Sequence, residues 1–112
     1  MGKEEQMAED ELDGLGRFTD PSVLIMSSLA EGPKHGYAIT KDIEAFGGVS
    51  LGPGTLYGAL SRLESRGLIE AVASTQRRQP YRLTARGTAV LVSQLRSLES
   101  VAAAGLARLA MA

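Results

Sequence analysis

The sequence predicts a mainly helical fold with one small β-hairpin, which is an α+β class, and a long helix at the C-terminus. Three observations support this prediction. Apolar residues recur at helical spacing in several separate segments, two short strand-like segments flank a polar loop near residue 76, and apolar or small residues recur every three or four positions between residues 91 and 109. With 112 residues and 44% hydrophobic content, the chain has the size and composition of one globular domain.

The first two helices are predicted over residues 20–30 and 36–46. Asp20 and Pro21 supply a cap and a first helical residue, because an aspartate side chain accepts from free amides and proline loses no needed donor there. Glycines follow both segments and end them. In the first helix Val23, Ile25, Met26 and Leu29 are expected to be largely buried, and in the second Ile39, Ile43 and Phe46 are expected to lie on one face.

The third predicted helix, residues 53–66, is the most informative segment of the chain. Pro53 presets the backbone at the helix start, and Gly67 can adopt the left-handed conformation that ends a helix. One side of this helix is a narrow apolar stripe formed by Leu56, Leu60 and Leu63.

The opposite side of the third helix has a different composition. It carries small residues, hydroxyl groups, one phenol and one guanidinium, but no acid. These residues are Gly54, Thr55, Tyr57, Gly58, Ser61, Arg62 and Ser65. A helix face of this kind can approach a phosphate backbone closely and contact base edges, so the segment is predicted to be a DNA-recognition helix.

The β-hairpin is predicted from two strands, residues 68–73 and residues 80–83. The polar loop between them carries the adjacent arginines Arg77 and Arg78. A helix followed by a strand, a basic loop and a returning strand is the order in which a winged helix-turn-helix domain ends. The refined fold prediction is therefore a winged helix-turn-helix with a long C-terminal dimerisation helix.

Three blocks of sequence carry a more specific resemblance. They are Gly36-Tyr37 after Gly32-Pro33-Lys34-His35, the block Gly54-Thr55-Leu56-Tyr57, Leu60, Arg62-Leu63-Glu64 and Gly67-Leu68-Ile69, and Tyr81-Arg82-Leu83-Thr84 with Gly87. In order and spacing they resemble the PadR family of bacterial transcriptional regulators, over roughly residues 19–87. One departure is Gly52, where many members have serine, and it weakens the helix cap by about a few tenths of a kcal/mol.

The last helix is predicted to begin after Thr84 and to carry a heptad seam. The seam consists of Leu91, Leu95, Leu98, Ala102, Gly105 and Leu109, at steps of four and three residues. A helix of about 26 residues is roughly 39 Å long, which is too long for so small a domain to cover. The seam therefore predicts a symmetric homodimer, and the resemblance implies the same. The alternative is that its near half packs on the first helix of its own chain.

Charge is distributed unevenly along the chain. Residues 1–20 hold seven acidic and two basic residues, a balance of −5, whereas residues 21–112 hold ten basic and six acidic residues, a balance of +4. The expected organisation is a flexible acidic extension (1–17), a winged helix-turn-helix DNA-binding domain (18–84) and a dimerisation helix (85–112). The extension is either a solvated leader or a segment that screens the basic surface or caps a partner subunit.

Nine residues are predicted to contact DNA: Thr55, Tyr57, Ser61 and Arg62 on the recognition helix, Arg77 and Arg78 on the wing, and Lys34, Tyr37 and Lys41 at the start of the second helix. Arg62 has the forked guanidinium that pairs with guanine, or it forms an ion pair with Glu64 or Glu70. Tyr57 is a phosphate donor or a half-buried core residue. The arginines of the wing and the two lysines have solvated surface positions as their alternatives.

Several functions are excluded. The single histidine, His35, has no cysteine or cluster of carboxylates near it in the sequence, so neither a metal nor a cofactor is expected; a hydrogen bond at the helix start is its expected role. No nucleophile, base and orienting residue form a catalytic set, and the chain is predicted not to be an enzyme. It has no apolar run long enough for a membrane and no signal pattern, and the absence of cysteine suits the cytoplasm.

The resulting function is a sequence-specific transcriptional regulator that binds double-stranded DNA as a homodimer on a palindromic operator. A repressor is the expected form. The resemblance implies a small aromatic or drug-like effector near the dimer interface. The alternative is a winged-helix module that binds proteins and not DNA.

Overall fold

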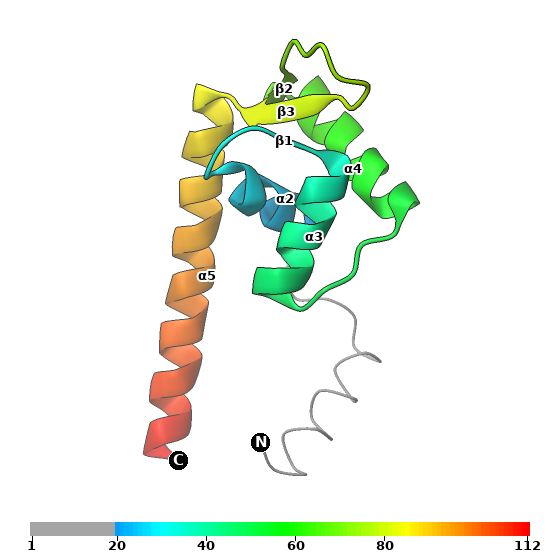
Figure 1. Cartoon of the computed structure of the whole chain (residues 1–112). Coiled ribbons are helices and arrows are strands. Elements are labelled where there is room, and N and C mark those ends of the chain that lie inside the picture. The colour runs from blue at the N-terminus through cyan, green and yellow to red at the C-terminus, as the bar shows by residue number, and fades with distance from the viewer. Residues whose placement is uncertain (1–19) are drawn as a thin grey trace.

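The computed structural model describes residues 20–112 as one helical domain with a small sheet (Figure 1). The predicted acidic extension, residues 1–17, lies outside the described residues. The helices are α2 (Pro21–Leu29), α3 (Gly36–Gly47), α4 (Pro53–Ser65) and α5 (Ala85–Met111), and the strands are β1 (Lys34–His35), β2 (Ile69–Ala71) and β3 (Pro80–Leu83).

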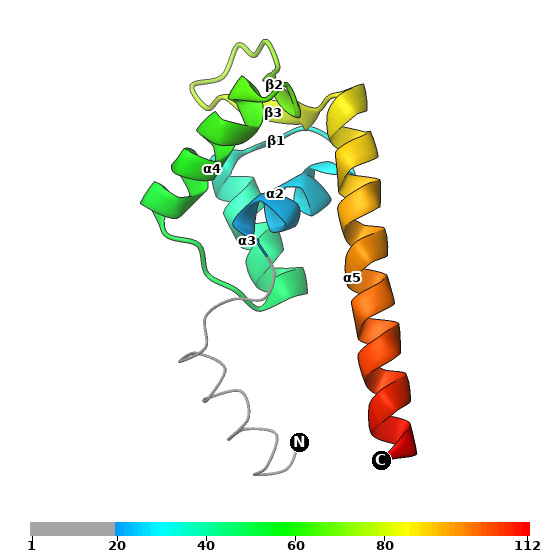
Figure 2. The ribbon, with the colours of Figure 1, turned by 180° about the vertical axis from the view of Figure 1, so that it is seen from behind.

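The helix α2 lies at the centre of the domain. It contacts α3 and α4 on one side, α5 on the other, and β3 above (Figures 1 and 2). Packing on all these sides explains why the helix is apolar around most of its circumference. The most deeply buried side chains of the core are Ile25, Ile39, Ile43, Leu60 and Ile69.

Side chains close the starts of three helices. Asp20 accepts a hydrogen bond from the amide of Ser22 at 2.7 Å, and Thr84 accepts one from the amide of Gly87 at 3.0 Å. His35 closes the start of α3 in the same way. The α4 start has no side-chain cap, as expected for a glycine at that position.

The sheet has three antiparallel strands in the order β1-β3-β2. The hairpin β2–β3 is as predicted, although β2 is shorter than the predicted strand. The strand β1 was not predicted, because two residues are too few to show an alternating pattern. Its pairing of His35 with Pro80 and of Lys34 with Tyr81 brings the start of α3 against the wing.

Phe46 follows the helical spacing of Ile39 and Ile43, but its side chain is 51% exposed. Ile39 and Ile43 are fully buried on the predicted face of α3. At the last turn, however, the residue beside Leu24 is Gly47, whose missing Cβ would lie 3.5 Å from the Leu24 side chain. Because α3 approaches α2 through this glycine, the phenyl ring stays outside the core.

The near end of α5 is fixed to the domain by close backbone contact. A Cβ at Gly87 would overlap the carbonyl of Leu68, so only glycine fits there. The same carbonyl accepts a hydrogen bond from the amide of Thr84 at 3.2 Å. Leu91 is 4% exposed within the single chain. Its assignment to a dimer interface is therefore corrected, because it belongs to the domain core.

Most of the remaining seam residues are exposed. Leu98 is partly buried against the core, whereas Leu95 is 42% and Leu109 73% exposed. Ala102 and Gly105 are exposed as well. Among residues 20–112, no helix is both long and apolar enough to cross a membrane.

Candidate nucleic-acid interface

The outward face of α4 is held in place by its buried stripe. Leu56, Leu60 and Leu63 are between 2% and 4% exposed, so the opposite side of the helix faces solvent. Thr55, Ser61 and Arg62 are exposed there, as the sequence predicts, together with Tyr57.

Tyr57 stands on the surface where α4 passes close to α3. Its side chain is 58% exposed, so it is not the half-buried core residue of the alternative interpretation. A Cβ at Gly36 would lie 3.0 Å from its hydroxyl oxygen and 3.3 Å from the Leu56 side chain. The glycine thus lets the two helices approach and leaves the phenol over the start of α3.

Arg62 has neither of the ion pairs that the sequence offered as an alternative. Glu70 instead accepts from Nε of Arg82 at 2.8 Å, across the β2–β3 pair. Glu64 forms no ion pair among the described residues. The Arg62 guanidinium extends along α4 towards Gly58 and remains a predicted DNA contact.

Two basic side chains of this surface lie close to the aromatic ring of Tyr37. Its ring is 58% exposed, and the guanidinium carbon of Arg78 lies 5.2 Å and Nζ of Lys41 5.6 Å from its centroid. The His35 ring lies alongside, 6.5 Å between centroids and 22° between planes. Cation–π attraction at such distances ties the wing to the start of α3.

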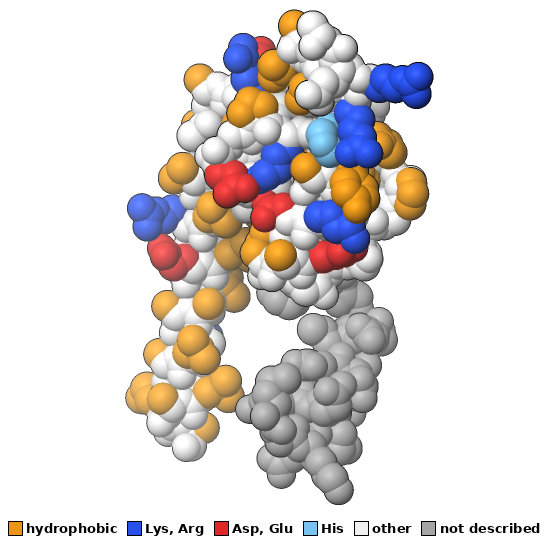
Figure 3. Space-filling view, viewed as in Figure 1, with side chains coloured by type: hydrophobic (Ala, Val, Ile, Leu, Met, Phe, Trp, Pro, Cys, Tyr) orange, Lys and Arg blue, Asp and Glu red, His pale blue; other side chains and the backbone are white. Residues whose placement is uncertain are grey.

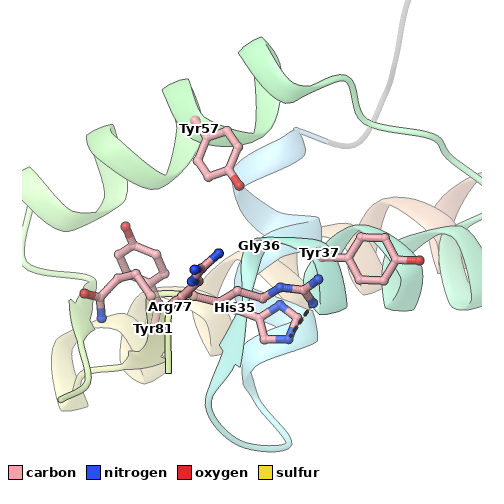
Figure 4. Close-up of a pocket in the computed structure, with 8 residues that line it drawn as sticks. His35, Gly36, Tyr37, Tyr57, Arg77 and Tyr81 are labelled. Atoms are coloured by element: carbon pink, nitrogen blue, oxygen red, sulfur yellow. Dashed lines mark hydrogen bonds between the residues drawn. The ribbon is translucent and has the colours of Figure 1, made fainter. Parts of the chain in front are cut away.

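A hollow of about 340 Å³ separates α4 from the wing (Figure 4). It is lined by His35, Gly36, Tyr37, Tyr57, Arg77, Arg78, Gln79 and Tyr81. No carboxylate lies among these residues. Burial, followed by the negative charge of Glu64, raises the pKa of Tyr81 above its ordinary value of 10.0, so its phenol stays protonated and can donate.

The base of the wing is closed by one side-chain amide. Nε2 of Gln79 donates to the carbonyls of Val72 at 2.9 Å and Pro80 at 2.8 Å. Arg77 and Arg78 are exposed. Basic side chains gather beside the histidine on this face of the molecule (Figure 3).

The prediction that Lys34 contacts DNA is corrected, because its ammonium group contacts acceptors of its own chain. Its side chain is only 15% exposed, and Nζ contacts Glu31, the carbonyl of Ser28 and, at 3.2 Å, the Asp42 carboxylate. The hydroxyl of Ser28 donates to the same carboxylate at 2.7 Å. That hydrogen bond, followed by the one from Lys34, lowers the pKa of Asp42 below its ordinary value of 3.8. The ammonium thus neutralises a carboxylate within the chain.

Lys41 remains exposed at 57% and is 3.5 Å from Glu44, an arrangement that solvent screens. Of the predicted DNA contacts, the structure brings Tyr37, Lys41, Tyr57, Arg77 and Arg78 together around one surface. In the described part of the chain, no group of three acidic or histidine side chains is placed to hold a metal.

Three residues of this surface were missed from the sequence: His35 beyond its capping role, Gln79 and Tyr81. The sequence could have indicated that Tyr81 points inward from β3, because successive side chains of a strand point to opposite faces. Tyr81 shares a face with Leu83, while Arg82 points the other way. No pattern in the sequence indicates the wing contact of His35, since it arises from a strand of only two residues.

The three-helix core, the hairpin and the exposed helix beside it define a winged helix-turn-helix protein. Comparison with known families supports this class and makes it specific. Residues 25–93 match the transcriptional regulator PadR-like family. The chain belongs to this family.

Two curated relatives are similar over most of the chain. Transcriptional regulator Rv3488 of Mycobacterium tuberculosis is 36% identical over 81 residues, which are 70% of this chain and 75% of the relative. An uncharacterized 37.1 kDa protein in transposon TN4556 of Streptomyces fradiae is 43% identical over 82 residues. The matched segment is 73% of this chain but only 24% of that longer protein.

Solved structures have the same architecture. A PadR family transcriptional regulator from Eggerthella lenta has a TM-score of 0.70 at 30% identity, with 94% of this chain and 93% of the other covered. A PadR family transcription regulator from Clostridium difficile has a TM-score of 0.67 at 30% identity, with 74% and 91% covered.

Proposed function

We propose that the protein binds double-stranded DNA sequence-specifically, with α4 in the major groove and the β2–β3 wing against the phosphate backbone. The observation that carries this proposal is the continuity of the exposed face of α4 that holds Thr55, Ser61 and Arg62 with the cationic surface around Tyr37. A recognition helix supplies contacts to base edges, and flanking arginines supply contacts to phosphates. Thr55, Ser61 and Arg62 are the proposed groove contacts from α4.

The proposed functional form is a homodimer joined through the far part of α5. Leu95, Leu98 and Leu109 lie on one seam with Ala102 and Gly105, and the large apolar side chains there are mostly exposed in the single chain. A second copy is the occupant with a matching face, because an isologous contact pairs the seam with itself. Two recognition helices would then read half-sites of a palindrome about 34 Å apart.

A cytoplasmic repressor released by a small molecule is the most specific form of this proposal. A cavity at the dimer seam would be lined by leucine, valine, methionine and alanine from α5, without tryptophan. Such a lining suits an apolar or aromatic effector through its shape and not through stacking.

The direct test is an electrophoretic mobility shift with the DNA upstream of the gene itself. The proposal expects retarded complexes that survive an excess of unrelated DNA and weaken steeply with salt. The alternative, a winged-helix module for protein binding, expects no retardation of either DNA at low salt. That result would overturn the proposed function.

A further inference from the structure

The two ring nitrogens of His35 face different groups. Nδ1 accepts from the amide of Ala38 at 3.3 Å and caps α3. Nε2, at the other side of the ring, lies 3.5 Å from a guanidinium nitrogen of Arg78 on the wing (Figure 4). A neutral imidazole has one nitrogen that donates and one that accepts, so it cannot accept from both groups at once.

The cap decides which nitrogen carries the proton. If Nδ1 carried it, two N–H groups would face each other at the start of α3, and the Ala38 amide would lose its partner. The hydrogen bond that Arg78 could then donate to Nε2 would be long, at 3.5 Å between the nitrogens. The hydrogen-bond network therefore assigns the proton to Nε2.

This assignment leaves two donors facing the same small space. An arginine guanidinium only donates, so the N–H of His35 and the N–H of Arg78 cannot satisfy each other. An oxygen atom placed between them would accept from both. The other side chains around the hollow are one arginine, three tyrosines and one glutamine, so no carboxylate of the lining provides that oxygen.

We infer that His35 and Arg78 together bind one phosphate oxygen, and that this phosphate belongs to the DNA backbone. An oxyanion is favoured because charge-assisted hydrogen bonds are the stronger kind and the lining is cationic. DNA is favoured over a free anion because the hollow lies between α4 and the wing, which the proposed function places on the duplex. The inference rests on that function.

The arrangement gives the phosphate a structural role. His35 belongs to β1 and caps α3, whereas Arg78 belongs to the wing loop and stacks over Tyr37. A single oxygen held by both joins the wing to the helix-turn-helix. Because the Ala38 amide fixes the imidazole and Tyr37 fixes the guanidinium, the two donors are preorganised for that oxygen.

His35→Asn separates capping from phosphate binding. Asparagine caps helices well, so the acceptor for Ala38 is kept, but its short side chain has no donor at the position of Nε2. The thermal midpoint should stay close to that of wild type. Binding to a mixed-sequence 30-bp duplex should weaken about tenfold for each subunit in contact with the duplex, which corresponds to roughly 1.4 kcal/mol. His35→Ser, a second capping residue, should behave in the same way.

The salt dependence distinguishes the two donors. A neutral imidazole displaces no counterion, so His35→Asn should lower log K equally at every salt concentration. Arg78→Ala should instead flatten the slope of log K against log salt by about 0.9 per subunit. Because both side chains hold one oxygen, the double variant should lose less than the sum of the single losses. As a control, His35→Asn combined with Arg62→Ala should be additive, because Arg62 lies on another helix.

Three results would overturn the inference. The first is wild-type duplex affinity in His35→Asn and His35→Ser. The second is strict additivity of His35→Asn with Arg78→Ala. The third is a titration in which inorganic phosphate, at ionic strength matched with chloride, shifts the His35 ring resonances while the asparagine variant binds duplex normally; a free anion would then be the ligand. If the wild type binds no duplex at all, the proposed function itself fails.

Discussion

The two ends of α5 belong to the same heptad seam but have opposite surroundings. At the near end, Gly87 packs against the Leu68 backbone and Leu91 is 4% exposed. At the far end, Leu106 and Leu109 are 68% and 73% exposed, and the helix extends beyond the rest of the domain (Figure 1). A heptad pattern thus predicts that one face of a helix packs against another segment. It does not indicate whether that segment belongs to the same chain or to a second copy.

The basic residues divide in the same way. Lys34 is occupied by carboxylate and carbonyl acceptors of its own chain, whereas Arg77 and Arg78 are exposed on the wing and have no carboxylate partner among the described residues. Groups that are satisfied within the chain should affect folding when they are changed. Substitutions of exposed side chains should change only DNA binding or dimer assembly. Four predictions test this division.

The largest effect is expected at the far end of α5. Leu109→Glu would remove two leucines from a proposed dimer interface, each worth about 1.5–3 kcal/mol, so the loss should be roughly 3–6 kcal/mol per dimer. Light scattering should show monomers, with the helical circular dichroism of the domain retained. Ala107→Glu, on the opposite side of α5, is the control and should remain dimeric. A monomeric wild type would contradict the prediction.

The near end should respond in the opposite manner. Leu91→Ala should lower the free energy of unfolding by about 2–5 kcal/mol, because it leaves a cavity in the core of a single chain. Urea denaturation measures this loss, and subunit dissociation should change little beyond it. Leu109→Ala is the matched truncation. If Leu109→Ala lowered the free energy of unfolding as much at a protein concentration where the chain is monomeric, the two ends of α5 would not differ as described.

Arg62 tests an outward group on α4. Arg62→Ala should change the free energy of unfolding by less than about 0.5 kcal/mol, as for surface positions. If the guanidinium is bidentate to guanine, discrimination against other bases should fall by about 1–3 kcal/mol per half-site. Competition binding with operator and unrelated duplexes measures it. An early thermal transition with unchanged sequence preference would identify Arg62 as a structural residue.

The smallest effect is expected for Asp42, an inward-directed group that water still reaches. Its folded pKa is lowered from 3.8 by the Ser28 hydrogen bond and then by Lys34, so its contribution is present above pH 3.8 and lost as pH falls through the lower folded value. Asp42→Asn should be less stable than wild type at neutral pH, and the difference should shrink in acid. Thermal melts across this range measure it. Glu44→Gln, beside the exposed Lys41, is the control and should show a smaller difference.

Local rules were sufficient for most of the fold. The cap at Asp20, the start of α4 at Pro53 and the left-handed Gly67 (φ +72°) were predictable because each depends on a few neighbouring residues. The stripe of α4 was predictable for the same reason. It also indicated the outward face, since a helix with one buried side must expose the other.

Long-range packing accounts for the failures. Phe46 follows the helical period of Ile39 and Ile43 but lies outside the core, because Gly47 brings α3 against Leu24 at that turn. In the sequence Lys34 resembles an ordinary surface lysine, but the fold places Asp42 beside it. Neither neighbour can be deduced from spacing along the chain.

The sequence alone determined the helices, the hairpin, the family resemblance and the side of α4 that faces outward, because these follow from backbone preferences and from the period of apolar residues. Only the tertiary structure decided where α5 leaves the domain and which cations are free. It also brought His35 to Arg78, two residues that are 43 positions apart. Such contacts depend on how elements distant in the chain approach one another, and local sequence does not encode that geometry.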